Sequence, residues 1–335
     1  MTIHTSPTEI DANQWSDLIE NSPVASFFQT RACYDFYASL SFLEPFVFGV
    51  SENKQLVGLI CGYIVADGGR LKRFFSRRAI VPAGALLHPD ISEEALKMLL
   101  KYTAESLKNK VIYLEFRNFN DYSAFRSTFE QIGFIYHPHL NFHVSTVNVD
   151  TIFQQLNSTK RRYVKISQQE GAEIIELQCD NDIKDYYRLL ADLYKTKVKT
   201  PLFPFEFFEK IVKIPECRLF GIKYQEQVIG GSICVFLKNK VVYEWFICGL
   251  DGKYKNIYPS TLATWAAIKY TAQNGFDYFD MMGAGKPNEG YGVREFKAEF
   301  GGTLVEHGRF LFVNKPFLYV LGKKVIQIVK KRQLL

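Results

Sequence analysis

The stretch FGVSENKQLVGLICGYIV at residues 48–65 recurs, without gaps, as FGIKYQEQVIGGSICVFL at residues 220–237. Both copies begin with Phe-Gly, and both carry a glutamine and a glycine at matching places, with Gly58 aligned to Gly230. Apolar residues flank a short polar turn in each copy, which predicts two β-hairpins. Because the hairpin is a common unit, an accidental match is the alternative to an internal duplication.

The same order of elements follows each hairpin. Residues 91–110, ISEEALKMLLKYTAESLKNK, have apolar side chains at helical spacing and lead into the run VIYLEF. Residues 259–275, PSTLATWAAIKYTAQNG, start with Pro-Ser and stop at a glycine, as helices do, and lead into FDYFDMM. A short helix and a strand close each half, at 121–140 and 292–313. Order and spacing therefore favour a duplicated chain, with domains expected at 1–150 and 151–315 and a tail at 316–335.

The composition is typical of a folded globular protein. Of the 335 residues, 47% are hydrophobic and 23% are charged, which excludes a disordered, collagenous or coiled-coil chain. The formal net charge of +6 suits an anionic partner without singling out nucleic acid. Six cysteines occur without any Cys-x-x-Cys pair, which argues against a disulfide framework or a zinc site. The N-terminus lacks a signal-peptide pattern and the apolar runs are short, so we expect a cytoplasmic location.

Four segments resemble a known family in their order along the chain. They are ASFFQTRACYDFY at 25–37, STKRRYVKISQQEGAEI at 158–174, YKNIYPSTLATWAAIKYTAQNGFDYFDMMG at 254–283, and GVREFKAEFGG at 292–302. Together they resemble the FemABX peptidyltransferases and the neighbouring double-GNAT "acetyltransferase 6" group. The resemblance covers nearly the whole chain and is strongest between residues 220 and 313.

This resemblance implies an α/β (α+β) fold of tandem duplicated GNAT-like domains, each a mixed sheet flanked by helices. It also implies an acyltransferase that moves an aminoacyl (or acyl) group to an amine of a bacterial cell-envelope or peptidoglycan precursor. That precursor would be anionic and nucleotide- or lipid-linked, and the donor would be aminoacyl-tRNA. Two alternatives stay open: a GNAT-like N-acyltransferase using an acyl thioester on a sugar or lipid, and a duplicated GNAT scaffold without catalysis.

Lys297 is the residue expected to stabilise charge in the reaction. It matches the lysine of the family's closing Phe-Lys-x-x-Phe-Gly segment, to which the resemblance assigns that role. An ammonium group in a partly desolvated cleft can stabilise a tetrahedral oxyanion. The alternative is a solvated helix lysine paired with Glu295 or Glu299. Arg294 lies about one helical turn away, so it can share the face as a substrate-binding residue.

The run YFDMMGAGKPNEGYG predicts a strand end followed by a glycine-rich loop, where sites of α/β proteins gather. Asp280 can order this loop or orient the incoming amine as a catalytic residue. The alternative for Asp280 is a cap that accepts hydrogen bonds from backbone N–H groups. Tyr291 is expected to line the loop and bind substrate.

Two basic and aromatic patches suit a phosphate-bearing ligand. The first comprises Lys253, Tyr254, Lys255 and Tyr258, just before the helix at 259–275. The second comprises Lys160, Arg161, Arg162 and Lys165. Solvated helix faces are the alternative for both.

We expect no bound cofactor and no metal. The segment DGKYKNIYPST before the helix at 259–275 lacks the glycines of a CoA-binding loop, so acetyl-CoA is a less favoured donor than aminoacyl-tRNA. His137, His139 and His143 lie close together in the sequence, but Pro138 interrupts them and no acidic or cysteine partner lies nearby.

The tail PFLYVLGKKVIQIVKKRQLL, from Pro316, mixes apolar residues with lysines and an arginine. This pattern suits a helix lying on an anionic membrane, which would place the protein peripherally at the inner face of the cytoplasmic membrane. The alternative is a terminal helix packed on its own domain, with lysines favoured by the helix dipole.

Overall fold

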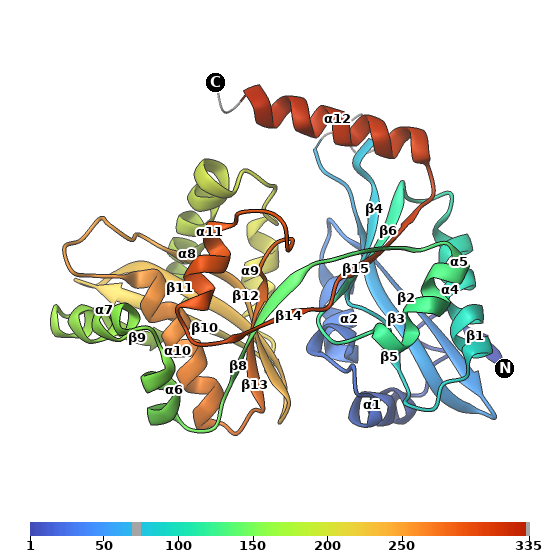
Figure 1. The fold of residues 1–335 in the computed structure, drawn as a ribbon, viewed down its shortest axis with the longest axis horizontal. Helices are drawn as coiled ribbons and strands as arrows, with labels where there is room; N and C mark the ends of the chain where they lie inside the picture. Colours follow the sequence, from blue (N-terminus) through green and yellow to red (C-terminus); the bar gives the residue numbers. More distant parts are fainter. Residues whose placement is uncertain (69–74, 333–335) are drawn as a thin grey trace. The chain divides into compact units, whose positions relative to one another are not determined.

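The chain folds into two compact units, each with its own sheet and core (Figure 1). The computed structural model describes residues 1–68 and 75–332, and side chains in the C-terminal helix as far as Lys324. In the tail expected at 316–335, the side chains after Lys324 lie outside the described part of the structure. Unit 1 comprises Met1–Pro138 and His307–Leu335, and unit 2 comprises His139–Glu306.

Unit 1 is built on a mixed sheet with strand order β1-β2-β3-β4-β6-β15-β7, in which β5 adds to β3. Helices α4 and α5 cover one face of this sheet and share its main apolar core (Figure 1). Its strands are β1 (Thr2–His4), β2 (Glu44–Glu52), β3 (Gln55–Val65), β4 (Arg78–Ala83), β5 (Leu86–Leu87), β6 (Tyr113–Asn118), β7 (Ile135–His137) and β15 (Arg309–Val313). Its helices are α1 (Ala12–Asn21), η1 (Phe27–Gln29), α2 (Arg31–Ser39), α4 (Glu93–Leu107), η2 (Ser123–Phe125), α5 (Arg126–Ile132) and α12 (Pro316–Arg332).

Unit 2 has a second mixed sheet, with strand order β14-β8-β13-β12-β11-β10-β9. The long helix α10 is apolar on nearly every side and packs in its core, which explains why so many of its residues are buried. The strands are β8 (Leu140–Ser145), β9 (Glu173–Glu176), β10 (Cys217–Tyr224), β11 (Gln227–Leu237), β12 (Val241–Gly249), β13 (Tyr278–Gly283) and β14 (Thr303–Glu306). The helices are α6 (Val149–Gln155), α7 (Ser158–Gln169), α8 (Asp180–Leu193), the π-helical turn Tyr194–Val198, α9 (Phe205–Ile211), α10 (Pro259–Gln273) and α11 (Gly292–Ala298).

The two hairpins, β2–β3 and β10–β11, have the same register. In β2–β3 the pairing shifts after Val50↔Gly58, and in β10–β11 it shifts after Ile222↔Gly230. The bulge thus falls at the aligned glycine in both copies. Each hairpin also turns through two left-handed residues, Asn53 and Lys54 in one copy and Gln225 and Glu226 in the other. A shared bulge and a shared turn support duplication over accident.

The duplication extends over the whole sheet, strand for strand. Reading from β1 in unit 1 and from β9 in unit 2, both sheets run through an antiparallel hairpin to a parallel pair flanking a long helix. In both sheets, the two strands that follow lie far apart in the sequence. β15 lies between β6 and β7, and β8 lies between β13 and β14.

Because of this strand exchange, the boundaries between the two units differ from those expected from the sequence. The structure divides it at 138/139 and 306/307, where the sequence-based boundaries were near 150 and 315. β8 pairs with β13 and β14, and β15 pairs with β6 and β7, so each strand belongs to the sheet opposite to the one its position suggests. The chain thus passes from one unit to the other between β7 and β8 and again between β14 and β15, without a separate linker.

The parallel pair is where the two units differ. In unit 1, β4 and β6 pair from Ala79↔Leu114 to Ala83↔Asn118. In unit 2, β12 and β13 pair only from Val241↔Tyr278 to Tyr243↔Asp280, although both strands continue. The two strands therefore diverge after Asp280, and the candidate site lies at that point.

The strand exchange predicts how unit 1 responds to truncation. Removing every residue after Glu306 takes β15 out from between β6 and β7, together with buried Phe310, which stacks on Phe129 at 4.2 Å between ring centroids. We expect those amides of β6 that face β15 to lose their protection from hydrogen exchange in this shortened chain, whereas the pairing with β4 remains. A chain ending at Lys315 keeps β15 and serves as the control. Full protection of β6 without β15 would contradict the exchange.

Candidate functional site

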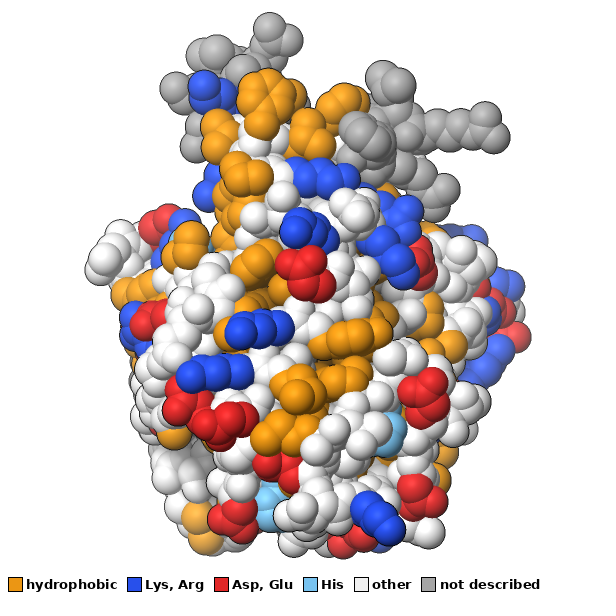
Figure 2. Space-filling model, turned by 90° about the vertical axis from the view of Figure 1, so that its right-hand side faces the viewer, with side chains coloured by type: hydrophobic (Ala, Val, Ile, Leu, Met, Phe, Trp, Pro, Cys, Tyr) orange, Lys and Arg blue, Asp and Glu red, His pale blue; other side chains and the backbone are white. Residues whose placement is uncertain are grey.

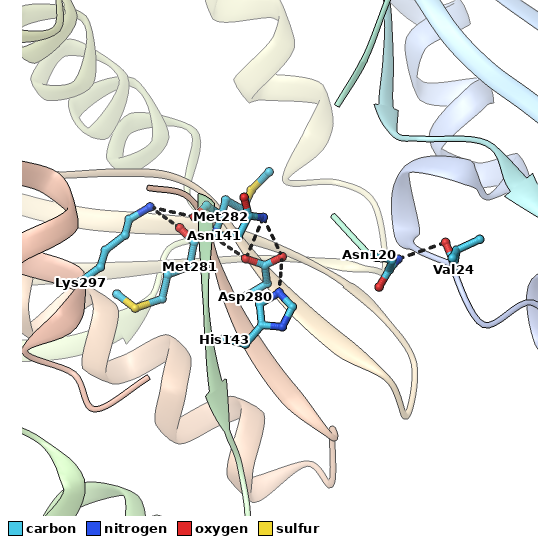
Figure 3. Close-up of polar contacts among 8 residues, drawn as sticks. All are labelled: Val24, Asn120, Asn141, His143, Asp280, Met281, Met282 and Lys297. Atoms are coloured by element: carbon cyan, nitrogen blue, oxygen red, sulfur yellow. Dashed lines mark hydrogen bonds and ion pairs between the residues drawn. The ribbon is translucent and has the colours of Figure 1, made fainter. Parts of the chain in front are cut away.

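Asp280 is fully buried and fixes the bend at the end of β13 (Figure 3). Its carboxylate accepts a hydrogen bond of 2.6 Å from the backbone N–H of Met282, a residue held in the left-handed region at φ 58°. Asn141 Nδ2 donates to it at 3.3 Å, and His143 Nε2 lies 3.4 Å from it. These contacts fit the alternative of a capping carboxylate, because they use the acceptor sites and hold a backbone turn that a non-glycine residue adopts only at a cost.

Asn141 and His143 were not expected here. Both come from β8, which the sequence-based boundaries assigned to the other domain, and Asn141 lies 139 residues from Asp280. The spacing of the three nearby histidines pointed to no such role. The signal in the sequence was the polar Asn and His between the apolar residues of the strand LNFHVS.

Lys297 lies inside the protein and not on a solvated helix face. The residue is 7% exposed, and its Nζ donates to the carbonyl oxygens of Met281, of Gly283 at 2.8 Å and of Met282 at 3.4 Å (Figure 3). The pairing with Glu295 or Glu299 that the alternative required is replaced by these three carbonyls. Because β12 has diverged from β13, the Lys297 ammonium supplies the donors for carbonyls beyond the paired segment.

Electrostatics make this ammonium unusual. Burial lowers the pKa of Lys297 from its ordinary value, and the charges of Glu244 and Asp280 act against that shift. Lys297 thus combines a desolvated cation with two buried carboxyl groups near it.

Glu244 is a residue that the sequence reasoning missed. It is 4% exposed on β12, and its Oε1 accepts hydrogen bonds from Thr264 Oγ1 at 2.9 Å and Ser232 Oγ at 3.3 Å. Burial raises the pKa of Glu244, and the charge of Lys297 opposes the shift. The sequence did contain a signal, since a glutamate interrupts the apolar strand VVYEWFICG just where β12 leaves β13.

Arg294 orders the glycine-rich loop through its backbone. Its Nε donates to the carbonyl of Ala284 at 2.8 Å, and its terminal nitrogens donate to the carbonyls of Lys286 and, at 3.4 Å, of Pro287. The donors expected to hold substrate are therefore engaged with the loop. Tyr291, at the start of α11, is 42% exposed and available beside that loop. The pKa of Tyr194 is raised to about 12, first by burial and then by the charge of Tyr291.

The second expected patch divides into buried and exposed residues. Lys160 is 4% exposed and pairs with Glu299 at 3.1 Å, so it joins α7 to the residue that follows α11. Arg161 donates to the carbonyls of Gln154, at 2.6 Å, and Leu156 and thereby closes the end of α6. Arg162 and Lys165 remain exposed. Of the two arginines proposed for substrate, Arg162 is thus the accessible one.

The first patch meets Arg162 at the N-terminus of α10. Tyr258 stacks on Tyr163 with ring centroids 3.5 Å apart and an interplanar angle of 8°, and the Arg162 guanidinium lies 5.5 Å from the Tyr163 ring. Such a stack with a cation beside it presents flat apolar faces and a positive charge together.

The rest of the first patch lies on the loop before α10. Lys253 and Lys255 are exposed, whereas Tyr254 packs on the core against Tyr224. Asp251 Oδ1 accepts a hydrogen bond of 3.3 Å from the Ser260 N–H, so a carboxylate already occupies the N-terminal end of α10.

Replacement of Lys297 tests its structural role. We expect Lys297→Ala to lower the free energy of unfolding by roughly 1–3 kcal/mol, because buried carbonyls lose their donor. Lys269→Ala, at an exposed position of α10, should stay within about 0.5 kcal/mol of the parent. Denaturant unfolding measures both. Equal stability of the two variants would mean that Lys297 is not held as described.

Glu244 gives a pH-dependent prediction. The pKa of Glu244 is raised in the folded state, so at a pH above the ordinary glutamate pKa the folded state binds more protons than the unfolded state. This carboxyl therefore makes stability fall as pH rises through that range. We expect Glu244→Gln to flatten the fall, whereas Glu295→Gln, at an exposed position of α11, leaves it unchanged. Urea midpoints measured from acid to neutral pH decide, and parallel profiles of parent and Glu244→Gln would refute the assignment.

Known proteins resemble this chain in part of its sequence and in its whole fold. The model of the FemAB family matches residues 213–331. The crystal structure of FemX is similar over 96% of this chain and 100% of that chain, with a TM-score of 0.73 and 13% identity. No curated protein sequence matches the chain.

Two further solved structures share the fold. A tandem GNAT protein from the clavulanic acid biosynthesis pathway has a TM-score of 0.60 at 12% identity, over 93% of this chain and 98% of that chain. L-PGS from Bacillus licheniformis has a TM-score of 0.57 at 12% identity, over 93% of this chain and 96% of that chain. Together with the strand-for-strand duplication, these likenesses confirm the expected architecture. The chain has the tandem GNAT fold that these structures share, and the FemAB family model matches its residues 213–331.

Proposed function

We propose that this protein is an aminoacyltransferase that transfers an aminoacyl group from aminoacyl-tRNA to an amine of an anionic cell-envelope precursor, nucleotide- or lipid-linked. One observation carries the proposal: the buried ammonium of Lys297 at the divergence of β12 and β13, with the carboxyl groups of Glu244 and Asp280 as its electrostatic partners. The match of the FemAB family model to the part of the chain that contains this site supports the same activity.

The transfer requires charge stabilisation at one atom. The acceptor amine forms a bond to the carbonyl carbon of the aminoacyl ester, and the carbonyl oxygen becomes an oxyanion. The ester C–O bond then breaks, the ribose hydroxyl of the tRNA leaves, and the proton lost by the amine restores that hydroxyl. A cation in a desolvated position stabilises the oxyanion more strongly than one in water. Lys297 is the residue in this role.

The neighbouring residues position Lys297. Its three donors are engaged with carbonyls at the end of β13, so catalysis requires one of them to turn from a carbonyl toward the oxyanion. Asp280 holds the backbone that carries these carbonyls, and the charge of Glu244 favours the protonated ammonium. Asp280 and Glu244 are thus positioning residues, and Arg294 acts in the same way on the loop.

The N-terminus of α10 favours a donor other than CoA. A pyrophosphate bound there would meet a like charge, because the Asp251 carboxylate already accepts a hydrogen bond from the Ser260 N–H, the first N–H of the helix. The loop just before α10 exposes Lys253 and Lys255, and α7 exposes Arg162. Tyr258 adds a stacked aromatic face. These groups suit the phosphates of a nucleotide or tRNA. Tyr291, which is exposed beside the glycine-rich loop, is the residue that we assign to binding the acceptor.

Transfer of a labelled amino acid from charged tRNA to an acceptor amine tests the proposal. We expect Lys297→Ala to lower kcat by roughly 10²–10³-fold, since one group that stabilises an oxyanion is lost. Asp280→Asn should also lower kcat, because it weakens the acceptor that holds Met282. Lys269→Ala is the control at an exposed site.

The donor is tested with acetyl-CoA in place of charged tRNA. Transfer from acetyl-CoA alone would support the thioester alternative and contradict the tRNA proposal. Undiminished transfer by Lys297→Ala would contradict its role, and absence of transfer from both donors to nucleotide- and lipid-linked envelope precursors would favour the scaffold without catalysis.

A further inference from the structure

Helix α12 exposes a stripe of large apolar side chains. Phe317 is 80% exposed, Val320 51% and Leu321 42%, and their spacing of three and four residues puts them on one face of the helix. In the part of the chain that the structure describes, few large apolar residues are as exposed as Phe317. Leaving such a stripe in water is unfavourable, so a partner surface is expected.

Positive charge borders this stripe. Lys323 and Lys324 follow it on the same helix and are exposed. A groove in unit 1, at the start of α12, is lined by three more cations, Arg77, Lys110 and Lys315, and by apolar residues that include Ile64, Val65 and Ile112. Glu44 is the one acidic residue among the groove's lining residues, and it pairs with Arg77 and, at 3.9 Å, with Lys110, which leaves the lining with a net positive charge. Figure 2 shows hydrophobic side chains at the upper end of this face with Lys and Arg side chains below them.

The start of α12 is fixed on unit 1. The backbone N–H groups of Asn314 and Lys315 donate to the carbonyl of Ile112 at 2.9 and 3.0 Å. Tyr319 packs edge-on against Tyr113, with ring centroids 5.4 Å apart. The apolar stripe is therefore presented in a defined direction relative to the groove. No helix among residues 1–68 and 75–332 is both long and apolar enough to cross a membrane.

We propose that α12 and the adjoining groove form a docking surface for a bilayer that contains anionic lipids. The apolar stripe enters the boundary between headgroups and acyl chains, and the five cations contact lipid phosphates. A bilayer fits better than a second copy of this chain, because cations lie at both the start of α12 and beyond the stripe, and a second copy of this face would bring like charges together. The proposal stands independently of the transferase activity.

Binding of the full-length protein to vesicles tests the surface. Sedimentation with vesicles of phosphatidylcholine alone is compared with vesicles that also contain phosphatidylglycerol. We expect binding only to the second kind, and weaker binding as salt rises. Lys323→Gln combined with Lys324→Gln should lower the partition coefficient about 25-fold, at about fivefold per charge. Phe317→Glu combined with Val320→Glu should lower it by at least about tenfold.

Matched variants on unit 2 control for general changes of charge and polarity. Val147 is 75% exposed and Lys238 is exposed, so Val147→Glu and Lys238→Gln should bind as the parent does. Circular dichroism verifies that every variant is folded. The proposal is overturned if the parent does not bind, if it binds neutral vesicles equally well, or if the α12 variants match the controls. It is also overturned if light scattering finds a dimer that Phe317→Glu dissociates, since a second copy then covers the stripe.

Discussion

Beyond Asp280, β13 continues without β12 beside it, and the carbonyl groups on that stretch need donors from elsewhere. Lys297 meets this constraint with a single ammonium, which has three protons and therefore serves three carbonyls. The rest of the site follows from it. A cation taken out of water needs nearby negative charge, which Glu244 and Asp280 provide. The same divergence that creates a structural need thus creates a desolvated positive charge.

The duplicated architecture makes this difference visible. Both sheets have corresponding strands in corresponding order, and both hairpins bulge at the same aligned glycine. In unit 1 the parallel pair stays closed as far as Ala83↔Asn118, and no comparable opening separates β4 from β6. The opening of the parallel pair in unit 2 is therefore a local change in a shared framework. It explains why we place the chemistry in unit 2, which contains most of the residues that the family model matches.

The exchange of β8 and β15 affects how the site is built. Asn141 and His143 reach Asp280 only because β8 crosses into the second sheet. Residues near the start of unit 2 thereby support a bend near its end. A site that depends on such a strand is coupled to the pairing of the whole sheet, because β8 is paired on both of its edges, with β13 and with β14.

The sequence by itself determined the hairpins, their duplication and the start of the long helix at Pro259, and it singled out the segment around Lys297 as a candidate site. These features depend on residues close together in the chain, and local patterns record them. Only the tertiary structure decided that Lys297 is buried, that Glu244 accompanies it, that Arg294 holds a loop, and that β8 and β15 change sheets. Strand pairing and burial join residues more than a hundred positions apart, such as Asn141 and Asp280, and no local periodicity specifies which distant strand will be the neighbour.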